Sequence, residues 1–178
     1  MDSGTQCYQR FLNGDQGALE EIVFLYNRKL ILFINQSVNN LSEAEDIAAE
    51  AFLDLITKKP RFRQESSFKT YLFAIGRNKA LNYLRKQSRH SSVPIEDIQL
   101  VEQNQILEEL EWDEEQRALM RALNNLLPDY RQVLHLIYFE ELSYREAATV
   151  LRKSEKQINN LAYRAKNALR DAMQQEVT

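Results

Sequence analysis

The chain has 178 residues and a formal net charge of −3. Its 4 glycines and 3 prolines are too few for a loop-rich sandwich or barrel, so composition favours an all-α fold. One cysteine and two histidines cannot form a disulfide or supply a zinc site, so we expect no metal and no cofactor. No apolar run could cross a bilayer and no signal peptide is evident, which predicts a cytoplasmic protein without membrane insertion.

Charge is strongly segregated along the chain. Residues 58–90 carry ten Lys or Arg and one acid, a balance of +9. Residues 91–116 carry nine acids and no base, whereas residues 144–170 carry seven bases and two acids. Two basic segments that flank an acidic one suggest a polyanionic partner, although solvated helix faces would explain charge alone equally well.

Apolar spacing predicts three helices in the first half of the chain, over residues 16–36, 42–57 and 68–89. The second is expected to begin with a capping box formed by Ser42 and Glu45. Gly76 and Ala80 lie four residues apart in the third helix, where small side chains would let another helix approach closely. We therefore expect residues 1–90 to form one small helical bundle.

The third predicted helix has a second, polar face. Asn78, Asn82, Arg85 and Arg89 step by 4, 3 and 4 residues, so they share one stripe that can donate to phosphates and base edges. The preceding loop, residues 61–67, is basic and contains an aromatic residue. Basic residues beside aromatic platforms favour binding of single-stranded nucleic acid. For the aromatic side chains the alternative is ordinary core packing, which the sequence leaves open.

Two capping boxes mark the C-terminal part of the chain. Ser143–Glu146 opens a very short helix, and Ser154–Gln157 opens a second helix eleven residues later, a pattern typical of a helix-turn-helix. The second helix of that motif enters the major groove of DNA, and an ordinary helical hairpin is the alternative. The residues expected to meet DNA are Lys156, Gln157, Asn159 and Asn160 at base edges and Arg164 and Lys166 at phosphates.

The linker between these parts is acidic and contains no aromatic residue up to residue 103. We therefore predict three segments: a helical domain over 1–90, an acidic linker over 91–110, and a helix-turn-helix domain over 111–178. Pro128 is expected in the first turn of a helix in the last segment.

Several motifs in this order resemble bacterial RNA polymerase sigma factors of the extracytoplasmic-function (ECF) group. Residues 44–52 (AEDIAAEAF) resemble the segment that grips the polymerase clamp, and residues 62–72 with 75–78 resemble the promoter-melting region. Residues 127–128 and 138–148 then lead into the helix-turn-helix, which Arg164 and Ala165 close as in that family. The resemblance covers nearly the whole chain.

This resemblance implies roles that spacing could not supply. It implies that Asp46, Glu50 and Phe52 dock on RNA polymerase core, and that loop 61–67 with Asn78 captures a base flipped from the minus-ten promoter element. The helix over 156–164 would read the minus-thirty-five element, and an anti-sigma protein is a common further partner. The residues expected at the minus-ten element are Arg61, Phe62, Arg63, Ser66, Ser67, Tyr71, Asn78, Asn82, Arg85 and Arg89.

The chain departs from the family pattern at a few positions. Ala49 stands where Gln is frequent, which puts part of the clamp contact in question. Arg152 stands where Gly is frequent in the helix-turn-helix turn, which predicts a reshaped turn. Asn159 replaces a basic residue, which puts one phosphate contact in question.

Two other classes of function are alternatives for this sequence. A helix-turn-helix regulator that does not bind polymerase is the main alternative, but it has no need of the separate +9 segment. An enzyme is disfavoured because no His or Cys accompanies the carboxylates and there is no glycine-rich phosphate loop.

Overall fold

The computed structural model describes residues 2–60, 62–63, 65–90 and 113–176. Within these ranges the secondary structure is helical throughout and contains no strand, which confirms the all-α prediction. Arg61 and the predicted acidic linker over 91–110 lie outside the described residues.

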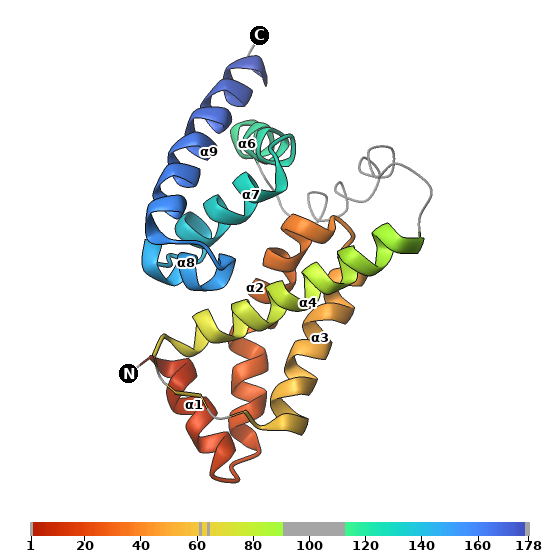
Figure 1. Ribbon diagram of the computed structural model, residues 1–178, viewed down its shortest axis with the longest axis vertical. Coiled ribbons are helices and arrows are strands. Elements are labelled where there is room, and N and C mark those ends of the chain that lie inside the picture. Colours follow the sequence, from red (N-terminus) through yellow and green to blue (C-terminus); the bar gives the residue numbers. More distant parts are fainter. Residues whose placement is uncertain (1, 61, 64, 91–112, 177–178) are drawn as a thin grey trace.

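The N-terminal domain is a bundle in which α2 contacts α1, α3 and α4 (Figure 1). Helix α1 has no counterpart among the predicted helices. Its first turn is capped by the Asp2 carboxylate, which accepts from the Thr5 backbone N–H at 2.8 Å. The other three helices lie where apolar spacing predicted them. The bounds are α1 (Ser3–Leu12), α2 (Gly17–Val38), α3 (Leu41–Lys58) and α4 (Phe68–His90).

The predicted capping box at Ser42 is wrong, because α3 begins one residue earlier. Its N-cap is Asn40, whose side-chain oxygen accepts from the Glu43 backbone N–H at 3.0 Å. The preceding residue, Asn39, ends α2 in the left-handed conformation with φ 54°. The turn between the helices is therefore so short that Asn40 already has the extended backbone of a cap.

Close approach of α2 and α4 depends on Gly76. A Cβ atom at this position would lie 2.7 Å from Leu30 Cδ1 and 3.3 Å from Ile34 Cδ1. This confirms that the Gly76–Ala80 pair lets a neighbouring helix come near. It also fixes which face of α4 turns inward, and so leaves Asn82, Arg85 and Arg89 on the outside.

The C-terminal domain places Pro128 at the first position of its helix and Ser143 at an N-cap, both as predicted. A π-helical turn, η2, follows α7 directly. The bounds are α6 (Glu114–Asn124), α7 (Pro128–Leu134), η2 (His135–Phe139), α8 (Tyr144–Leu151) and α9 (Glu155–Glu176).

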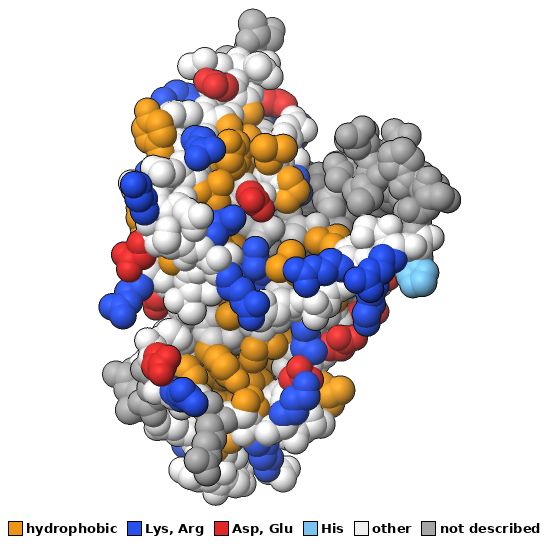
Figure 2. Space-filling model, in the orientation of Figure 1, with side chains coloured by type: hydrophobic (Ala, Val, Ile, Leu, Met, Phe, Trp, Pro, Cys, Tyr) orange, Lys and Arg blue, Asp and Glu red, His pale blue; other side chains and the backbone are white. Residues whose placement is uncertain are grey.

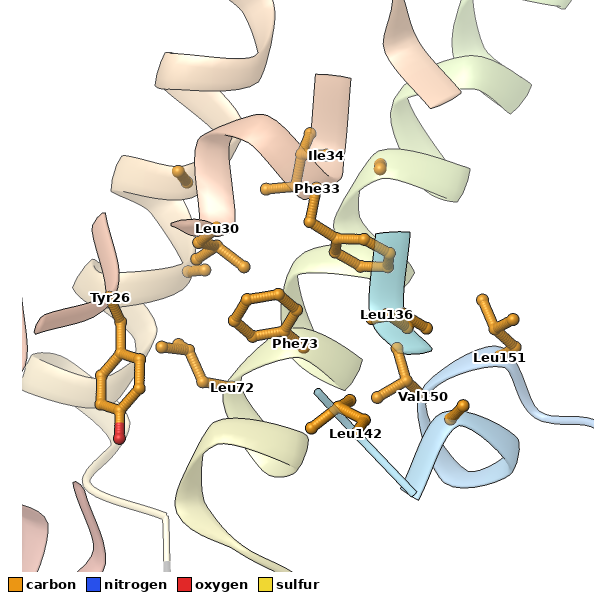
Figure 3. Packing of buried hydrophobic residues seen from close by; sticks show 14 of the residues in the cluster. Tyr26, Leu30, Phe33, Ile34, Leu72, Phe73, Leu136, Leu142, Val150 and Leu151 are labelled. Atoms are coloured by element: carbon orange, nitrogen blue, oxygen red, sulfur yellow. The ribbon is translucent and has the colours of Figure 1, made fainter. Parts of the chain in front are cut away.

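The two domains pack against each other, with α4 on α8 and α2 on α7 (Figure 1). Their apolar side chains form one continuous cluster (Figure 3). Phe33 of α2 stacks on Phe73 of α4 with ring centroids 5.2 Å apart. Leu136 and Val150 of the C-terminal domain lie on the side of these rings that faces α8 (Figure 3). The junction is therefore built like a protein core.

Candidate nucleic-acid interface

The helix-turn-helix consists of α8 and α9, and both predicted capping boxes are present. Ser143 Oγ accepts from the Glu146 backbone N–H at 3.2 Å, and Glu146 accepts from the Ser143 N–H at 2.9 Å. Ser154 Oγ likewise accepts from the Gln157 N–H at 3.1 Å, and Gln157 Oε1 accepts from the Ser154 N–H at 2.8 Å. Each helix start is thereby fixed by its own sequence.

The turn between α8 and α9 is not reshaped by Arg152. Arg152 has φ 51° and ψ 46°, the left-handed conformation that glycine would adopt at this position. Its N–H donates to the Ala148 carbonyl, and the Lys153 N–H donates to the same carbonyl at 3.1 Å. The expected reshaping is therefore wrong. The turn keeps the left-handed conformation although a side chain there costs roughly 1 kcal/mol of strain.

The recognition face of α9 is open to solvent. Ile158, Ala162 and Ala165 are buried against the domain, and the opposite side of the helix is polar. The predicted DNA-reading residues that are exposed on it are Lys156, Gln157, Asn159, Asn160, Arg164 and Lys166.

Two of these residues already have partners. The carboxamide oxygen of Gln157 is engaged in the capping box, so its amide nitrogen is the group left for a base edge. Lys166 Nζ lies 5.4 Å from the centre of the Tyr138 ring, and the hydrogen bond that Lys166 donates to the Tyr138 hydroxyl raises the pKa of Lys166. Asn159 and Asn160 belong to the same exposed turn.

The basic stripe follows α4. Asn82, Arg85 and Arg89 are exposed and Asn78 is half-buried. Figure 2 shows Lys and Arg side chains gathered along α4 and at its junction with the C-terminal domain. Arg77 lies at this junction, where burial lowers its pKa and its Nε has no hydrogen-bond partner. The exposed outer side of α4 therefore carries several cations, including Arg85, Lys86 and Arg89.

The aromatic residues in and beside the loop pack against the core and also line a pocket, the two roles that the sequence left open. The rings of Phe62 and Tyr71 lie 5.3 Å apart, and Phe62 meets Phe68 edge-on at 6.1 Å. Both Phe62 and Tyr71 are half-buried, and both line a cavity of about 460 Å³ together with Arg63 and Ser66. Part of the predicted base-capturing loop therefore lines a pocket, whereas Asn78, the other residue of that prediction, is not among the lining residues.

Other predicted contacts turn out to have structural roles. Ser67 is the residue before α4, and its Oγ accepts from the Thr70 backbone N–H at 3.2 Å. Phe52 is 6% exposed and belongs to the core, so its ring supports α3 and is not presented to a partner. Sequence spacing missed this burial because Phe52 directly follows the buried Ala51 on a helix whose inward face is broad.

The outer face of α3 carries the remaining predicted polymerase contacts. Asp46 and Glu50 are exposed, as is Ala49 between them. Lys79 of α4 reaches this face, where its Nζ lies 2.9 Å from Asp54 and 3.9 Å from Glu50. The hydrogen bond from Lys79 lowers the pKa of Asp54. The acidic face of α3 is therefore anchored to the helix that carries the basic stripe.

Sequence reasoning missed the contribution of α8 to the loop pocket. Arg145 and Thr149, on the exposed side of the first helix of the helix-turn-helix, line the same cavity as Phe62 and Tyr71. A contact between residues so far apart in the chain has no local signal.

Within the described ranges, no three His, Cys, Asp or Glu side chains are grouped so that they could hold a metal ion. No helix in these ranges is long and apolar enough to cross a membrane.

The chain is similar to known proteins over nearly its whole length. The family model for sigma-70 region 2 matches residues 24–90, and that for sigma-70 region 4 matches residues 116–169. The RNA polymerase sigma-H factor of Pseudomonas aeruginosa is 31% identical, over 98% of this chain and 95% of that protein. The ECF sigma-E factor of Escherichia coli K12 is 28% identical, over 93% of this chain and 92% of that protein.

Solved structures agree in fold. A sigma factor from Bartonella quintana, RpoE in complex with the anti-sigma factor NepR, matches with a TM-score of 0.66 and 24% identity, over 87% of this chain and 96% of that chain. CnrH, in complex with the cytosolic domain of CnrY, matches with a TM-score of 0.70 and 20% identity, over 97% of this chain and 98% of that chain. With both sigma-70 regions matched in order, the chain belongs to the ECF group of bacterial RNA polymerase sigma factors.

Proposed function

We propose that this sigma factor binds RNA polymerase core in the cytoplasm, recognises two promoter elements and assists melting of the DNA. The observation that carries this proposal is that one chain presents two separate surfaces whose chemistry suits nucleic acid. One is the exposed polar face of α9, and the other is α4 with its aromatic pocket. A stand-alone regulator would use the first surface alone, so the second favours a role in melting.

The two surfaces suit different tasks. The face of α9 presents amides and cations at the start of a helix, which suits base edges and phosphates in a major groove. The pocket beside α4 offers the rings of Phe62 and Tyr71 next to Arg63, which suits an unstacked base and its phosphate. We accordingly assign α9 to the minus-thirty-five element, and α4 with its pocket to the minus-ten element.

Polymerase binding is assigned to the acidic face of α3. Asp46 and Glu50 are exposed there and lie one helical turn apart, so they can meet a basic surface together. An anti-sigma protein is an expected further partner, since Bartonella RpoE was solved with one.

The first test is co-elution with bacterial RNA polymerase core on gel filtration at moderate salt. A stoichiometric complex is expected, and Asp46→Asn should weaken it while the variant keeps its helical circular-dichroism spectrum. Glu20→Gln, an exposed acid on α2, is the matched control and should elute as the native chain does. A folded protein that binds DNA but never binds core would favour the stand-alone regulator.

A further inference from the structure

Helix α1 belongs to neither of the surfaces assigned above, and it lies outside residues 24–90, the range that the sigma-70 region 2 model matches. Its side chains nevertheless pack against the segment that builds the loop pocket. Tyr8, in the middle of α1, is fully buried, and its hydroxyl donates to the Pro60 carbonyl at 2.7 Å. Pro60 directly precedes the loop over 61–67. Helix α1 therefore holds the chain where that loop begins.

The same helix holds the other end of the loop, where α4 begins beside α1 (Figure 1). Phe68 is the first residue of α4, and its ring stacks on the Tyr8 ring with centroids 4.9 Å apart. Partial burial would raise the pKa of Asp2, but hydrogen bonds from Thr5 and from the Phe68 backbone outweigh burial and lower it. The carboxylate that caps α1 thus also binds the start of α4. One short helix contacts both ends of the loop.

The residues before the loop receive further support from α1. Lys59 ends α3 in the left-handed conformation with φ 39°, and its Nζ lies 5.4 Å from the centre of the Phe11 ring. Burial, with a smaller contribution from Tyr71, raises the pKa of Tyr8 to about 12. The Tyr8 hydroxyl therefore keeps its proton at neutral pH and remains a donor to the Pro60 carbonyl.

The contact from Tyr8 reaches the pocket through Phe62. The Tyr8 ring meets the Phe62 ring edge-on with centroids 6.4 Å apart, and Phe62 lines the pocket together with Tyr71. Tyr8 itself is not among the lining residues, so it does not touch a base held there. Groups that bind a ligand precisely need neighbours that lock their side chains in place. Tyr8 can therefore act on the pocket only through the position of Phe62 and of the loop.

We propose that α1 is a positioning element of the promoter-melting site, in which Tyr8 and Asp2 hold the two ends of the loop and so place the Phe62 ring in the pocket. This inference rests on the proposed function of that pocket. Unstacking a base costs free energy that only well-placed contacts in the pocket can offset. A loop released at one end would capture the base more weakly and with less discrimination between bases.

The hold on the loop is tested with Tyr8→Phe, which keeps the stacked ring and removes only the hydroxyl. The probe is single-stranded DNA from a promoter that the native holoenzyme selects from a random library, in four versions that differ at the captured base. Loss of one hydrogen bond should weaken binding of the preferred version about fivefold. The preference over the other three versions should decrease as well. Binding to duplex DNA that carries only the minus-thirty-five element should stay native.

Ile47→Val is the matched control. Ile47 is buried on α3, far along the helix from Pro60, and the loss of one methylene there should cost stability of the same order as Tyr8→Phe. A smaller amount of folded protein lowers binding of all four probes alike, so this variant should keep the native base preference. An equal decrease in base preference for both variants would show that Tyr8 only stabilises the bundle, which would overturn the proposal.

Trypsin cleavage after Arg63 in the free protein tests the hold on the loop without DNA. Arg63 is exposed, and cleavage there should be about fivefold faster in Tyr8→Phe than in the native chain or in Ile47→Val, as for a local opening populated about fivefold more. Unchanged cleavage in Tyr8→Phe would reject the proposal, as would faster cleavage with a native base preference. A native holoenzyme without preference among the four probes would reject the melting site itself, and the positioning role with it, whatever the cleavage rates.

Discussion

The guanidinium of Arg131 binds the backbone carbonyl of Gln36, 95 positions away, through Nε at 3.1 Å and Nη2 at 3.0 Å. Gln36 lies in the last turn of α2, where helix carbonyls have no partner within the helix. Nη1 of Arg131 also binds the carbonyls of Asn124 at 2.9 Å and Leu126 at 3.2 Å. One buried cation thus completes the end of α2 and holds the α6–α7 turn.

Replacing Arg131 by Met should lower the free energy of unfolding by about 3 kcal/mol, since three carbonyls would lose their donor at about 1 kcal/mol or more each. Urea unfolding followed by circular dichroism measures this loss. Arg121→Met is the control, because Arg121 pairs with Glu114 and Glu176 at the surface and should cost less than about 1 kcal/mol. Equal losses for the two variants would show that the buried bonds contribute little.

The Glu140 carboxyl should make the stability of the protein depend on pH. Burial alone would raise its pKa, but interactions with His135 and with the Lys69 ammonium, 2.6 Å away, outweigh burial and lower the pKa of Glu140 below its usual value. A carboxyl with a lowered pKa in the folded state contributes stability above its unfolded pKa, and this contribution is lost as pH falls through the folded value. The stability that Glu140 adds should therefore be full near neutral pH and fade below about pH 4.5.

Urea midpoints of the native protein and Glu140→Gln, measured from pH 7 to about pH 3.5, check this expectation. The difference in urea midpoint between the two proteins should decrease only at the acid end of this pH range. Glu141→Gln, at the exposed neighbouring residue, controls for the loss of one negative charge. A difference in urea midpoint that stays constant across the whole pH range would show that the stabilisation does not depend on the carboxylate form of Glu140.

Arg152 has a left-handed backbone conformation, so its replacement by glycine should stabilise the protein. Arg152→Gly removes the clash of Cβ with the backbone, roughly 1 kcal/mol, but adds freedom to the unfolded chain, so it should raise the free energy of unfolding by at most about 0.5 kcal/mol. Arg152 also repels Arg77 electrostatically, so Arg152→Ala is the informative comparison. The Ala variant loses the charge but keeps Cβ, and should gain clearly less. Equal increases in the free energy of unfolding for the Gly and Ala variants would show that the effect comes from the loss of charge.

Local signals in the sequence predicted most of the helices. The capping boxes at Ser143 and Ser154 were found because both partners lie within four residues. The first helix was missed because its cap, Asp2, has no carboxamide or carboxylate partner three residues later. The contact between Arg131 and Gln36 could not be predicted, because no local sequence pattern near either residue indicates the other.

The candidate site was predicted less completely than the fold, for a related reason. Sequence spacing shows which residues share a face, but it does not show whether a side chain is already engaged. Ser67 caps α4, and the Gln157 side chain completes the capping box of α9, so chemistry that suits DNA is partly used to build the helices. The wall that α8 adds to the pocket required the packing of the two domains.

Asn160 and Lys166 should affect DNA recognition differently, although both are exposed on α9. Asn160→Ala removes a group that can pair with adenine, so it should weaken binding by about 1–3 kcal/mol at sites with the preferred base and alter sequence preference. Lys166→Ala removes an expected phosphate contact, so it should weaken binding to all sequences alike and reduce the salt slope by about 1. Binding of the holoenzyme to a promoter library at several salt concentrations distinguishes the two effects. Asn167→Ala is the control, because the Asn167 side-chain oxygen already accepts a hydrogen bond from Arg170 Nη1 at 3.2 Å. A uniform loss from Asn160→Ala would remove it from the base-reading residues.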